Sequence, residues 1–387
     1  MPFPHRTIAV ERLFDGQPIL SPLGTGWESG VTFNASAILV TPNHETAYAA
    51  LLGEGGAEKH PNGIVAIHYR ARPKEDPGFQ HTRSFIGLAV YTPELELIRR
   101  YPEPVLSPSE DEDDFDYLGC EDPRVTYLDG WYWMVYCGVR KITADDPDKT
   151  WLATACIAKS RDLLTWDRIG AIIGYGDAFA ADATEPEDPD GRVGNKDGVL
   201  MPDRIGGKVY LLHRPMRGDN HEFRTALALS DRPEGPYLDL GFVNGALIMS
   251  DQYVSSWTGA GGVPIPLGDE RYLSIAHTGN YLENYKREYV LDAHLYDFKH
   301  LNPLKPSCIL RARMDSFMGP ETDFEVHGPF PDSVANVVFA CGNYLYNGWV
   351  YIVYGGGDSF TLAARVRLED LVKELEKREK ETFNEEC

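Results

Sequence analysis

The chain has 387 residues, of which 43% are apolar, so it is long enough to bury a large core. Its formal net charge of -22 argues against nucleic acid and anionic membranes as partners, because both require a cationic face. No segment reaches the roughly 20 apolar residues of a membrane span, and the first residues lack a charged and apolar leader pattern. These features predict a cytoplasmic protein.

The six cysteines are widely spaced and include no CxxC pair, so the sequence indicates neither a zinc site nor a disulfide framework. We expect them to be small buried hydrophobic residues. No other pattern indicates a metal site or a resident cofactor.

A unit of short β-rich strands separated by polar or Gly-containing turns recurs along the chain. The clearest copy reads EDPRVTYL, DG, WYWMVYCGVR and ATACIAKS. No helices of 10 to 15 residues alternate with these strands, which disfavours a parallel α/β fold. Five copies predict an all-β, five-bladed β-propeller that forms a single catalytic domain over residues 1–387. In chain order, the copies begin near Asn34, Glu121, Lys196, Gly259 and Asn336.

Two segments depart from the repeat. Residues 44–63 are rich in Gly, Glu and His, and we expect a loop insertion within the first blade. Residues 366–387 are predicted to form a C-terminal helix and tail, with the helix packed outside the propeller. That helix can act as a structural cap or assemble the chain into a homo-oligomer. Its apolar positions follow helical spacing at Leu368, Leu371, Val372 and Leu375.

Polar residues open several of the repeats. Innermost propeller strands begin at the central channel, so Asn34, Asp122, Asp197 and Asn336 are expected to meet in one pocket. The alternative is ordinary turn chemistry, in which Asn and Asp satisfy nearby backbone N–H groups. A functional pocket is favoured because the same repeats carry further polar residues toward it: Arg70, Arg124, Arg214, His213 and His277.

Six motifs appear in order along the chain: YRA at 69–71, GCEDPR at 119–124, NKD at 195–197, HRP at 213–215, PDSVANVVFACG at 331–342 and YGGGDS at 354–359. Together they resemble glycoside hydrolase family 130, the β-mannoside phosphorylases and β-mannosidases. The resemblance implies inverting cleavage of β-mannosidic linkages in manno-oligosaccharides, by phosphorolysis or by hydrolysis. Inorganic phosphate is the one co-substrate that it implies.

The resemblance also implies roles for individual residues. Asp122 is the expected general acid, which in phosphorylases acts through the 3-hydroxyl of the sugar. Glu121 and a partly dry pocket would raise the pKa of Asp122, whereas Arg124 would lower it. Trp27, Tyr69 and Trp257 can stack on sugar faces or pack in the core. The expected substrate contacts are Asn34, Arg70, Arg124, Lys196, Asp197 and Asp358.

Phosphate binding depends on a cationic site that the sequence matches in part. Asn195, Arg214 and His277 correspond to phosphate-binding positions, but Gly194 and Trp257 stand where the phosphorylases carry cations. Lys196, Arg217 or Arg140 can compensate. Otherwise the chain is a hydrolase whose base is Glu222, Glu283 or Glu288. The leaving sugar depends on loops such as 174–193, and the linkage, β-1,2 or β-1,4, stays open.

Two other readings compete with this one. A mannoside-binding propeller without activity has no need of Asp122 beside Arg70 and Asp358. A related five-bladed glycosidase acting on arabinans or fructans lacks the NKD, HRP and VANVVF set.

Overall fold

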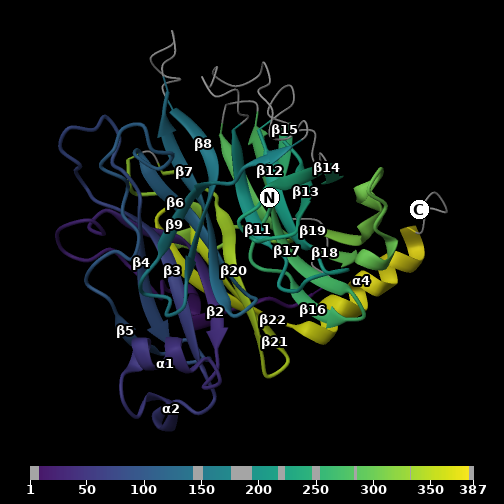
Figure 1. Cartoon of the computed structure of the whole chain (residues 1–387), viewed down its shortest axis with the longest axis horizontal. Helices are drawn as coiled ribbons and strands as arrows, with labels where there is room; N and C mark the ends of the chain where they lie inside the picture. The colour runs from purple at the N-terminus through teal and green to yellow at the C-terminus, as the bar shows by residue number, and fades with distance from the viewer. Residues whose placement is uncertain are drawn as a thin grey trace.

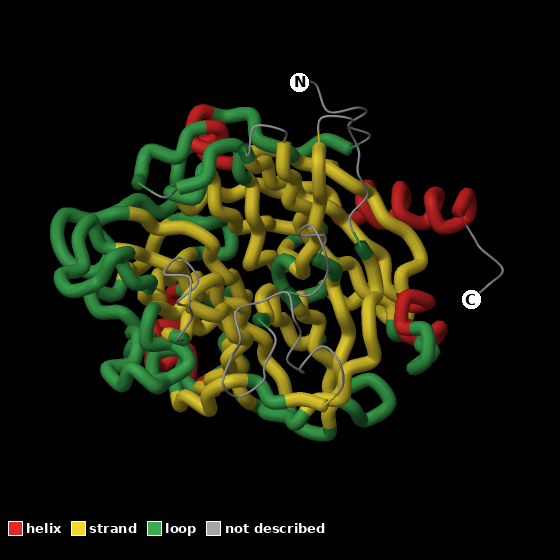
Figure 2. The backbone as a smooth tube through the Cα atoms, turned by 90° about the horizontal axis from the view of Figure 1, so that it is seen from above, coloured by secondary structure: helices red, strands yellow, loops and turns green. Residues whose placement is uncertain are grey.

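The computed structural model describes residues 8–142, 151–175, 194–216, 223–245, 253–282, 286–331 and 333–382. The described strands form five separate sheets around a common centre, which confirms the predicted five-bladed propeller (Figures 1 and 2). Neighbouring strands within each blade are antiparallel, with one short parallel addition in blade 3.

Each blade is built from strands that follow one another in the chain. Blade 1 contains β2 (Val31–Val40), β3 (Ile64–Arg72), β4 (Phe85–Tyr91) and β5 (Leu97–Arg100). Blade 2 contains β6 (Gly119–Leu128), β7 (Trp131–Lys141), β8 (Trp151–Ser160) and β9 (Asp167–Ala171). Blade 3 contains β11 (Asn195–Leu200), β12 (Val209–Pro215), β13 (Thr225–Ser230) and β14 (Tyr237–Asn244), with β10 (Gly174–Tyr175) on the β14 edge.

The last two blades differ from the simple pattern. Blade 4 contains β15 (Tyr253–Ala260), β16 (Ile265–Gly268), β17 (Arg271–Leu282), β18 (Arg287–Asp297) and β19 (Leu310–Met318). Both β15 and β16 pair with β17, so the inner strand begins before the expected Gly259. Blade 5 contains β20 (Val338–Tyr346), β21 (Trp349–Gly356), β22 (Phe360–Arg367) and β1 (Glu11–Arg12).

The pairing of β1 with β22 closes the ring. Glu11 lies opposite Arg365, and the Arg365 guanidinium donates to both carboxylate oxygens of Glu11 at 2.9 Å. Segments from opposite ends of the described chain therefore share blade 5, which packs against blade 1.

Apolar side chains fill the spaces between blades. Strand β3 shows why, because its alternating side chains face two neighbours. Ile64 and Ala66 pack in the cluster shared with blade 2, whereas Val65 and Ile67 pack in the cluster shared with blade 5. Similar clusters lie between the other adjacent blades. Strands buried on both faces explain the long apolar runs in the sequence.

The C-terminal helix is confirmed as α4 (Leu368–Thr382), which packs outside the propeller against β18, β19 and β22 (Figure 1). Leu371 and Leu375 are fully buried in the cluster between blades 4 and 5. Arg271 and Arg311 form ion pairs with Glu379 at 2.7 and 3.2 Å. No helix in the described ranges is long and apolar enough to span a membrane.

The expectation of a plain loop at residues 44–63 is wrong. This segment contains α1 (Glu45–Leu52) and α2 (Gly56–Lys59). The sequence ETAYAALL favours a helix, and Tyr48 and Leu51 are buried against blades 1 and 2. A further helix, α3 (Asp323–Val326), precedes β20 and begins with a capping box. In the described part of the chain, 3-10 helices cover Leu13–Gly16, Phe298–His300 and Pro306–Ile309.

The cysteine prediction holds for part of the set. Cys120, Cys137, Cys156 and Cys341 are buried and free. Cys308 instead forms a disulfide, which sequence spacing could not reveal because pairing depends on distances in the fold. Cys387 lies outside the described residues.

Candidate active site

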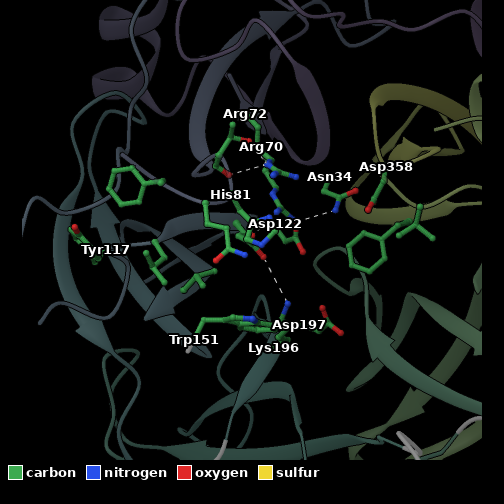
Figure 3. Close-up of a pocket in the computed structure, with 18 of the residues that line it drawn as sticks. Asn34, Arg70, Arg72, His81, Tyr117, Asp122, Trp151, Lys196, Asp197 and Asp358 are labelled. Atoms are coloured by element: carbon green, nitrogen blue, oxygen red, sulfur yellow. Dashed lines mark hydrogen bonds and ion pairs between the residues drawn. The ribbon is translucent and has the colours of Figure 1, made fainter. Parts of the chain in front are cut away.

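The inner strands of blades 1, 2 and 3 share a backbone feature near their starts. Asn34, Asp122 and Asp197 have left-handed backbones, with φ of 45°, 48° and 54°. Strand pairing shifts register at each of them. Such bulges re-aim a side chain out of the strand's alternation, and Asn and Asp tolerate positive φ better than most residues. All three side chains line one cavity (Figure 3).

This cavity has a volume of about 1040 Å³. The expected convergence holds for Asn34, Asp122 and Asp197 but not for Asn336, which does not line it. The backbone carbonyl of Asn336 instead accepts from the Tyr289 N–H at 2.9 Å, and Asp358 represents blade 5 in the cavity. The polar residues that are named in the sequence analysis and that line the cavity are Asn34, Arg70, Glu121, Asp122, Lys196, Asp197, Arg214 and Asp358.

Asp122 lies at the centre of a hydrogen-bonded group. Its Oδ1 accepts from Asn34 Nδ2 at 2.9 Å and from Arg70 Nη1 at 3.2 Å. Arg70 also binds Glu121, and its Nε donates to Ser84 at 2.9 Å. Lys196 Nζ lies 3.8 Å from Glu121 Oε2. Two carboxylates therefore share a partly buried arginine, which fixes the orientation of Asp122.

The structure resolves the competition over the Asp122 pKa. Burial raises this pKa, but the charges of Arg70, Arg124 and Lys196, together with the Asn34 hydrogen bond, hold it below its ordinary value. Asp122 is therefore ionised in the ligand-free pocket at neutral pH. To act as an acid, it must gain its proton when ligands change this balance of charge.

Asp358 and Asn34 face the same part of the pocket, and both can form further hydrogen bonds there. Burial raises the pKa of Asp358 to about 6, although Arg70 opposes that shift. Asn34 Oδ1 is buried and has no hydrogen-bond partner in the ligand-free structure. Both groups can therefore exchange hydrogen bonds with the hydroxyls of a bound sugar.

Asp197 organises a second, deeper group of charges. Its carboxylate pairs with Arg124 Nη2 at 3.1 Å, Arg214 Nε at 3.1 Å and His277 Nε2 at 3.3 Å. Burial raises the pKa of Asp197, but the charges of Arg214 and His277 lower it by more than burial raises it. The pKa of Asp197 therefore lies well below its ordinary value. Burial lowers the pKa of His277, although Asp197 opposes this shift.

Several predicted site residues lie behind the cavity rather than on its wall. Arg124, Asn195 and His277 do not line it. Arg124 is only 1% exposed and donates to the carbonyls of Ala260 and Gly261, so it links blade 2 to blade 4. Asn195 lies 2.9 Å from His213, whose pKa burial lowers to about 3. These residues position the groups in front of them, and direct ligand contact for them stays a prediction.

Three cationic residues of the cavity, Arg72, Lys141 and Arg287, were missed in the sequence analysis. Arg287, at the start of β18, lines the cavity together with Lys196 and Arg214. Its guanidinium lies over the Tyr281 ring, with 5.1 Å between the guanidinium carbon and the ring centroid. None of the six sequence motifs contains Arg287, so only the blade 4 hairpin could place it here. Of the substitutes expected from sequence, Arg217 lies outside the described residues, and Arg140 stacks on Phe115 without lining the cavity.

Of the two roles left open for Trp27, Tyr69 and Trp257, the structure favours packing over sugar stacking. Trp27 packs on Tyr69, whose hydroxyl binds Glu28, and Trp257 is 5% exposed beside Tyr281. None of the three lines the cavity, and Trp27 and Tyr69 belong to the hydrophobic cluster between blades 1 and 5. The aromatic residues that do line it are Phe79, Tyr117, Trp151, Tyr289 and Phe339.

Two glycines make room for the acidic and amide side chains. A Cβ at Gly355 would lie 2.1 Å from Asn34 Oδ1, and one at Gly259 would lie 2.1 Å from Asp197 Oδ2. Gly259 and Gly355, the latter within the YGGGDS motif, therefore lie where inner-strand side chains approach the neighbouring backbone too closely for a Cβ.

A group with metal-ligand chemistry lies outside the cavity. Asp292, His294 and Asp315 each place one ligand atom within 4.8 Å of the others. Asp292 is already used in the fold, because it accepts from Thr278 and from the N–H of Ser316, whose φ is 56°. This arrangement explains Asp292 as the support of an irregular turn in β19.

The structure is a five-bladed propeller whose cavity gathers hydrogen-bonded carboxylates and cationic side chains. The family model of β-1,4-mannooligosaccharide phosphorylases matches residues 65–377. The chain belongs to glycoside hydrolase family 130, a family of enzymes that cleave β-mannosides.

Similar proteins cover nearly the whole chain. A 1,2-β-oligomannan phosphorylase from Thermoanaerobacter sp. (strain X514) is 28% identical over 368 residues, which are 94% of this chain and 99% of that protein. A β-1,2-mannobiose phosphorylase from Listeria innocua, solved with β-1,2-mannobiose, has a TM-score of 0.66 at 20% identity and covers 96% and 100% of the two chains. A structure from work on family members that hydrolyse β-1,2-mannosidic linkages of Candida mannan has a TM-score of 0.64 at 21% identity and covers 94% of each chain.

Proposed function

We propose that this enzyme cleaves β-1,2-mannosidic bonds by phosphorolysis and releases α-mannose 1-phosphate. The observation that carries the proposal is the set of three cations, Lys196, Arg214 and Arg287, on the cavity wall. All three act electrostatically on the Tyr289 hydroxyl, so they surround one region of the pocket. The β-1,2 linkage is supported by the activity of the 1,2-β-oligomannan phosphorylase that resembles the chain over its length.

In this mechanism a phosphate oxygen attacks the anomeric carbon as the bond from that carbon to the leaving oxygen breaks. Asp122 supplies the proton that the leaving oxygen gains, through the sugar 3-hydroxyl as the family resemblance implies. Phosphate adds negative charge beside Lys196 and Arg214, and this charge opposes the cations that hold the Asp122 pKa low. Phosphate binding therefore favours the protonated acid that the reaction needs.

Hydrolysis is the second candidate, and one observation favours it. Trp257, at a position where phosphorylases carry a cation, is packed against Tyr281 and Tyr289 and brings no charge to the pocket. Hydrolysis requires a base, and none of the three glutamates predicted for this role is found among the described residues of the cavity wall. Glu288 does not line the cavity and accepts from the Tyr253 hydroxyl, while Glu222 and Glu283 lie outside the described residues.

The test is the product formed from β-1,2-mannobiose as phosphate is varied, followed by NMR. We expect α-mannose 1-phosphate, a rate that saturates with phosphate, and inhibition by sulfate. Free α-mannose released at the same rate without phosphate would establish hydrolysis instead. β-1,4-Mannobiose, assayed in parallel, tests the linkage.

Arg287→Gln sharpens this test because Arg287 is exposed at the cavity and its loss leaves no buried charge unpaired. Removing one charge-assisted hydrogen bond should raise the KM for phosphate by about tenfold or more. Arg204→Gln is the matched control, since Arg204 pairs with Asp129 away from the cavity. An unchanged KM for phosphate in Arg287→Gln would remove Arg287 from the anion site.

A further inference from the structure

Ser84 lies outside the cavity but contacts two residues of its wall. It directly precedes β4, is 2% exposed and belongs to none of the six sequence motifs. Its Oγ accepts from Arg70 Nε at 2.9 Å and donates to Glu121 Oε1 at 3.4 Å. Arg70 also pairs directly with the same Glu121 oxygen. The three side chains therefore form a closed ring of hydrogen bonds.

The direction of each hydrogen bond in this ring follows from the chemistry of the groups. A guanidinium has only donors and a carboxylate has only acceptors, whereas a serine hydroxyl is both donor and acceptor. Ser84 Oγ must therefore accept from Arg70, and its own proton is left for Glu121. The hydroxyl serves two neighbours of opposite charge at once. A methyl group cannot do this, and a thiol does it only weakly.

The backbone of Ser84 is anchored beside the strand that carries the expected acid. Its carbonyl accepts from the Cys120 N–H at 2.8 Å, and this hydrogen bond joins blade 1 to β6 of blade 2. Gly119 packs so closely against it that a Cβ there would lie 3.1 Å from the Ser84 nitrogen. Glu121 and Asp122 follow Cys120 directly in the same strand. The Ser84 hydroxyl is therefore fixed in position relative to both carboxylates.

Arg70 owes its orientation to contacts on several sides. Its Nε donates to Ser84, its Nη2 pairs with Glu121, and its Nη1 donates to Asp122 Oδ1 at 3.2 Å (Figure 3). Its guanidinium carbon lies 4.7 Å from the centroid of the Phe33 ring. A planar guanidinium that is bound through Nε and both Nη groups cannot turn without breaking a hydrogen bond. Loss of the Nε acceptor would free it to turn about the contact with Glu121 and away from Asp122.

The charge of Arg70 acts on Asp122 together with other groups. Burial raises the pKa of Asp122, and the charges of Arg70, Arg124 and Lys196 lower it. If Arg70 turns away, burial is opposed less and this pKa rises. The ionisable groups that face Asp122 are Arg70 on β3, Glu121 and Arg124 on β6, Lys196 on β11, Asp358 between β21 and β22, and the thiols of Cys137 on β7 and Cys341 on β20.

We propose that Ser84 is a positioning residue, which holds Arg70 in the orientation that contacts both Glu121 and Asp122. Because Ser84 does not line the cavity, it acts on the reaction through Arg70. The inference rests on the proposed function, in which Asp122 supplies the proton to the leaving oxygen, and adds a residue that sets when this proton is available.

The experiment measures kcat/KM for β-1,2-mannobiose as a function of pH, with every enzyme at the same saturating phosphate. The alkaline limb of this profile reports the pKa of the acid in the free enzyme. Ser84→Ala should lower the maximum of kcat/KM by about tenfold, the effect of one lost hydrogen bond to a charged group, and should move the alkaline limb to higher pH.

Three further variants separate the hydroxyl from the volume of the side chain. Ser84→Cys keeps the volume and should behave like Ser84→Ala, which also covers the case in which Ser84→Ala does not fold. Ser84→Thr keeps the hydroxyl and should restore both the maximum and the alkaline limb. Ser160→Ala is the control, because Ser160 is also 2% exposed and its Oγ accepts from N–H groups of a turn outside the cavity. Its pH profile should match that of the wild type.

A second readout needs no turnover. The titration of the Asp122 carboxyl can be followed by NMR of protein labelled in aspartate, with its signal assigned by its absence in Asp122→Asn. Its pKa should be higher in Ser84→Ala than in the wild type. If the wild type cleaves no mannoside but this pKa rises, the proposed function fails and the positioning role stands. If the wild type is active and neither the pKa nor the alkaline limb moves in Ser84→Ala and Ser84→Cys, or if Ser84→Thr shifts them equally, the positioning role is overturned.

Discussion

Asn34 and Asp122 meet across the boundary between blades 1 and 2, where Asn34 Nδ2 donates to Asp122 Oδ1 at 2.9 Å and both residues have left-handed backbones. Each bulge turns one side chain toward the other, so the hydrogen bond depends on two irregularities in different strands. The amide thus orients the acid while its own oxygen stays unpartnered.

The first prediction concerns the acid. Asp122→Asn should lower kcat by a factor on the order of 10² or more, because it removes the transferable proton. Folding should be preserved, since Asn also tolerates positive φ and keeps a hydrogen-bonding side chain. Turnover on β-1,2-mannobiose and the melting temperature check the two parts. Turnover close to the wild-type value would exclude Asp122 as the acid.

The second prediction concerns the buried charges behind the cavity. Arg124→Met leaves three backbone carbonyls, those of Asp122, Ala260 and Gly261, without this donor and removes one partner of Asp197. Breaking a buried ion pair typically costs about 3–5 kcal/mol, and we expect a loss of unfolding free energy of this order in urea denaturation.

The control for that measurement is Lys208→Met, which breaks an exposed ion pair with Asp231. Its effect should be much smaller than that of Arg124→Met, because solvent screens an exposed ion pair. Equal losses in the two variants would show that Arg124 does not stabilise the contacts between blades.

The third prediction concerns pH and Asp292. Burial, aided by the charge of Asp315, raises the pKa of Asp292 from 3.8 to about 7. A raised carboxyl pKa gives a contribution to stability that is complete below pH 3.8 and is lost as pH rises through 7. Asp292→Asn keeps a neutral side chain and should therefore flatten the fall in melting temperature between pH 5 and pH 8. Parallel pH profiles for wild type and variant would contradict the shift.

The propeller and its C-terminal helix were predictable because both rest on local patterns. Short strands with turn residues recur five times, and the apolar residues of α4 follow helical spacing. The pattern failed at residues 44–63, where ETAYAALL is helical but its neighbours resemble a loop. It also misplaced the start of the inner strand of blade 4, because two strands share β17 there.

The sequence by itself determined that Asn34, Asp122 and Asp197 open equivalent strands, since that conclusion needs only the order of repeats and the preference of Asn and Asp for irregular backbone. Only the tertiary structure decided which side chains complete the pocket. Arg287 at the start of β18 and Trp151 at the start of β8 line the pocket, whereas Trp257 packs against Tyr281 outside it. The tertiary structure also decided the sign of the Asp122 pKa shift. Charge interactions and stacking depend on distances between blades, and those distances arise from packing across the ring rather than from neighbours in the chain.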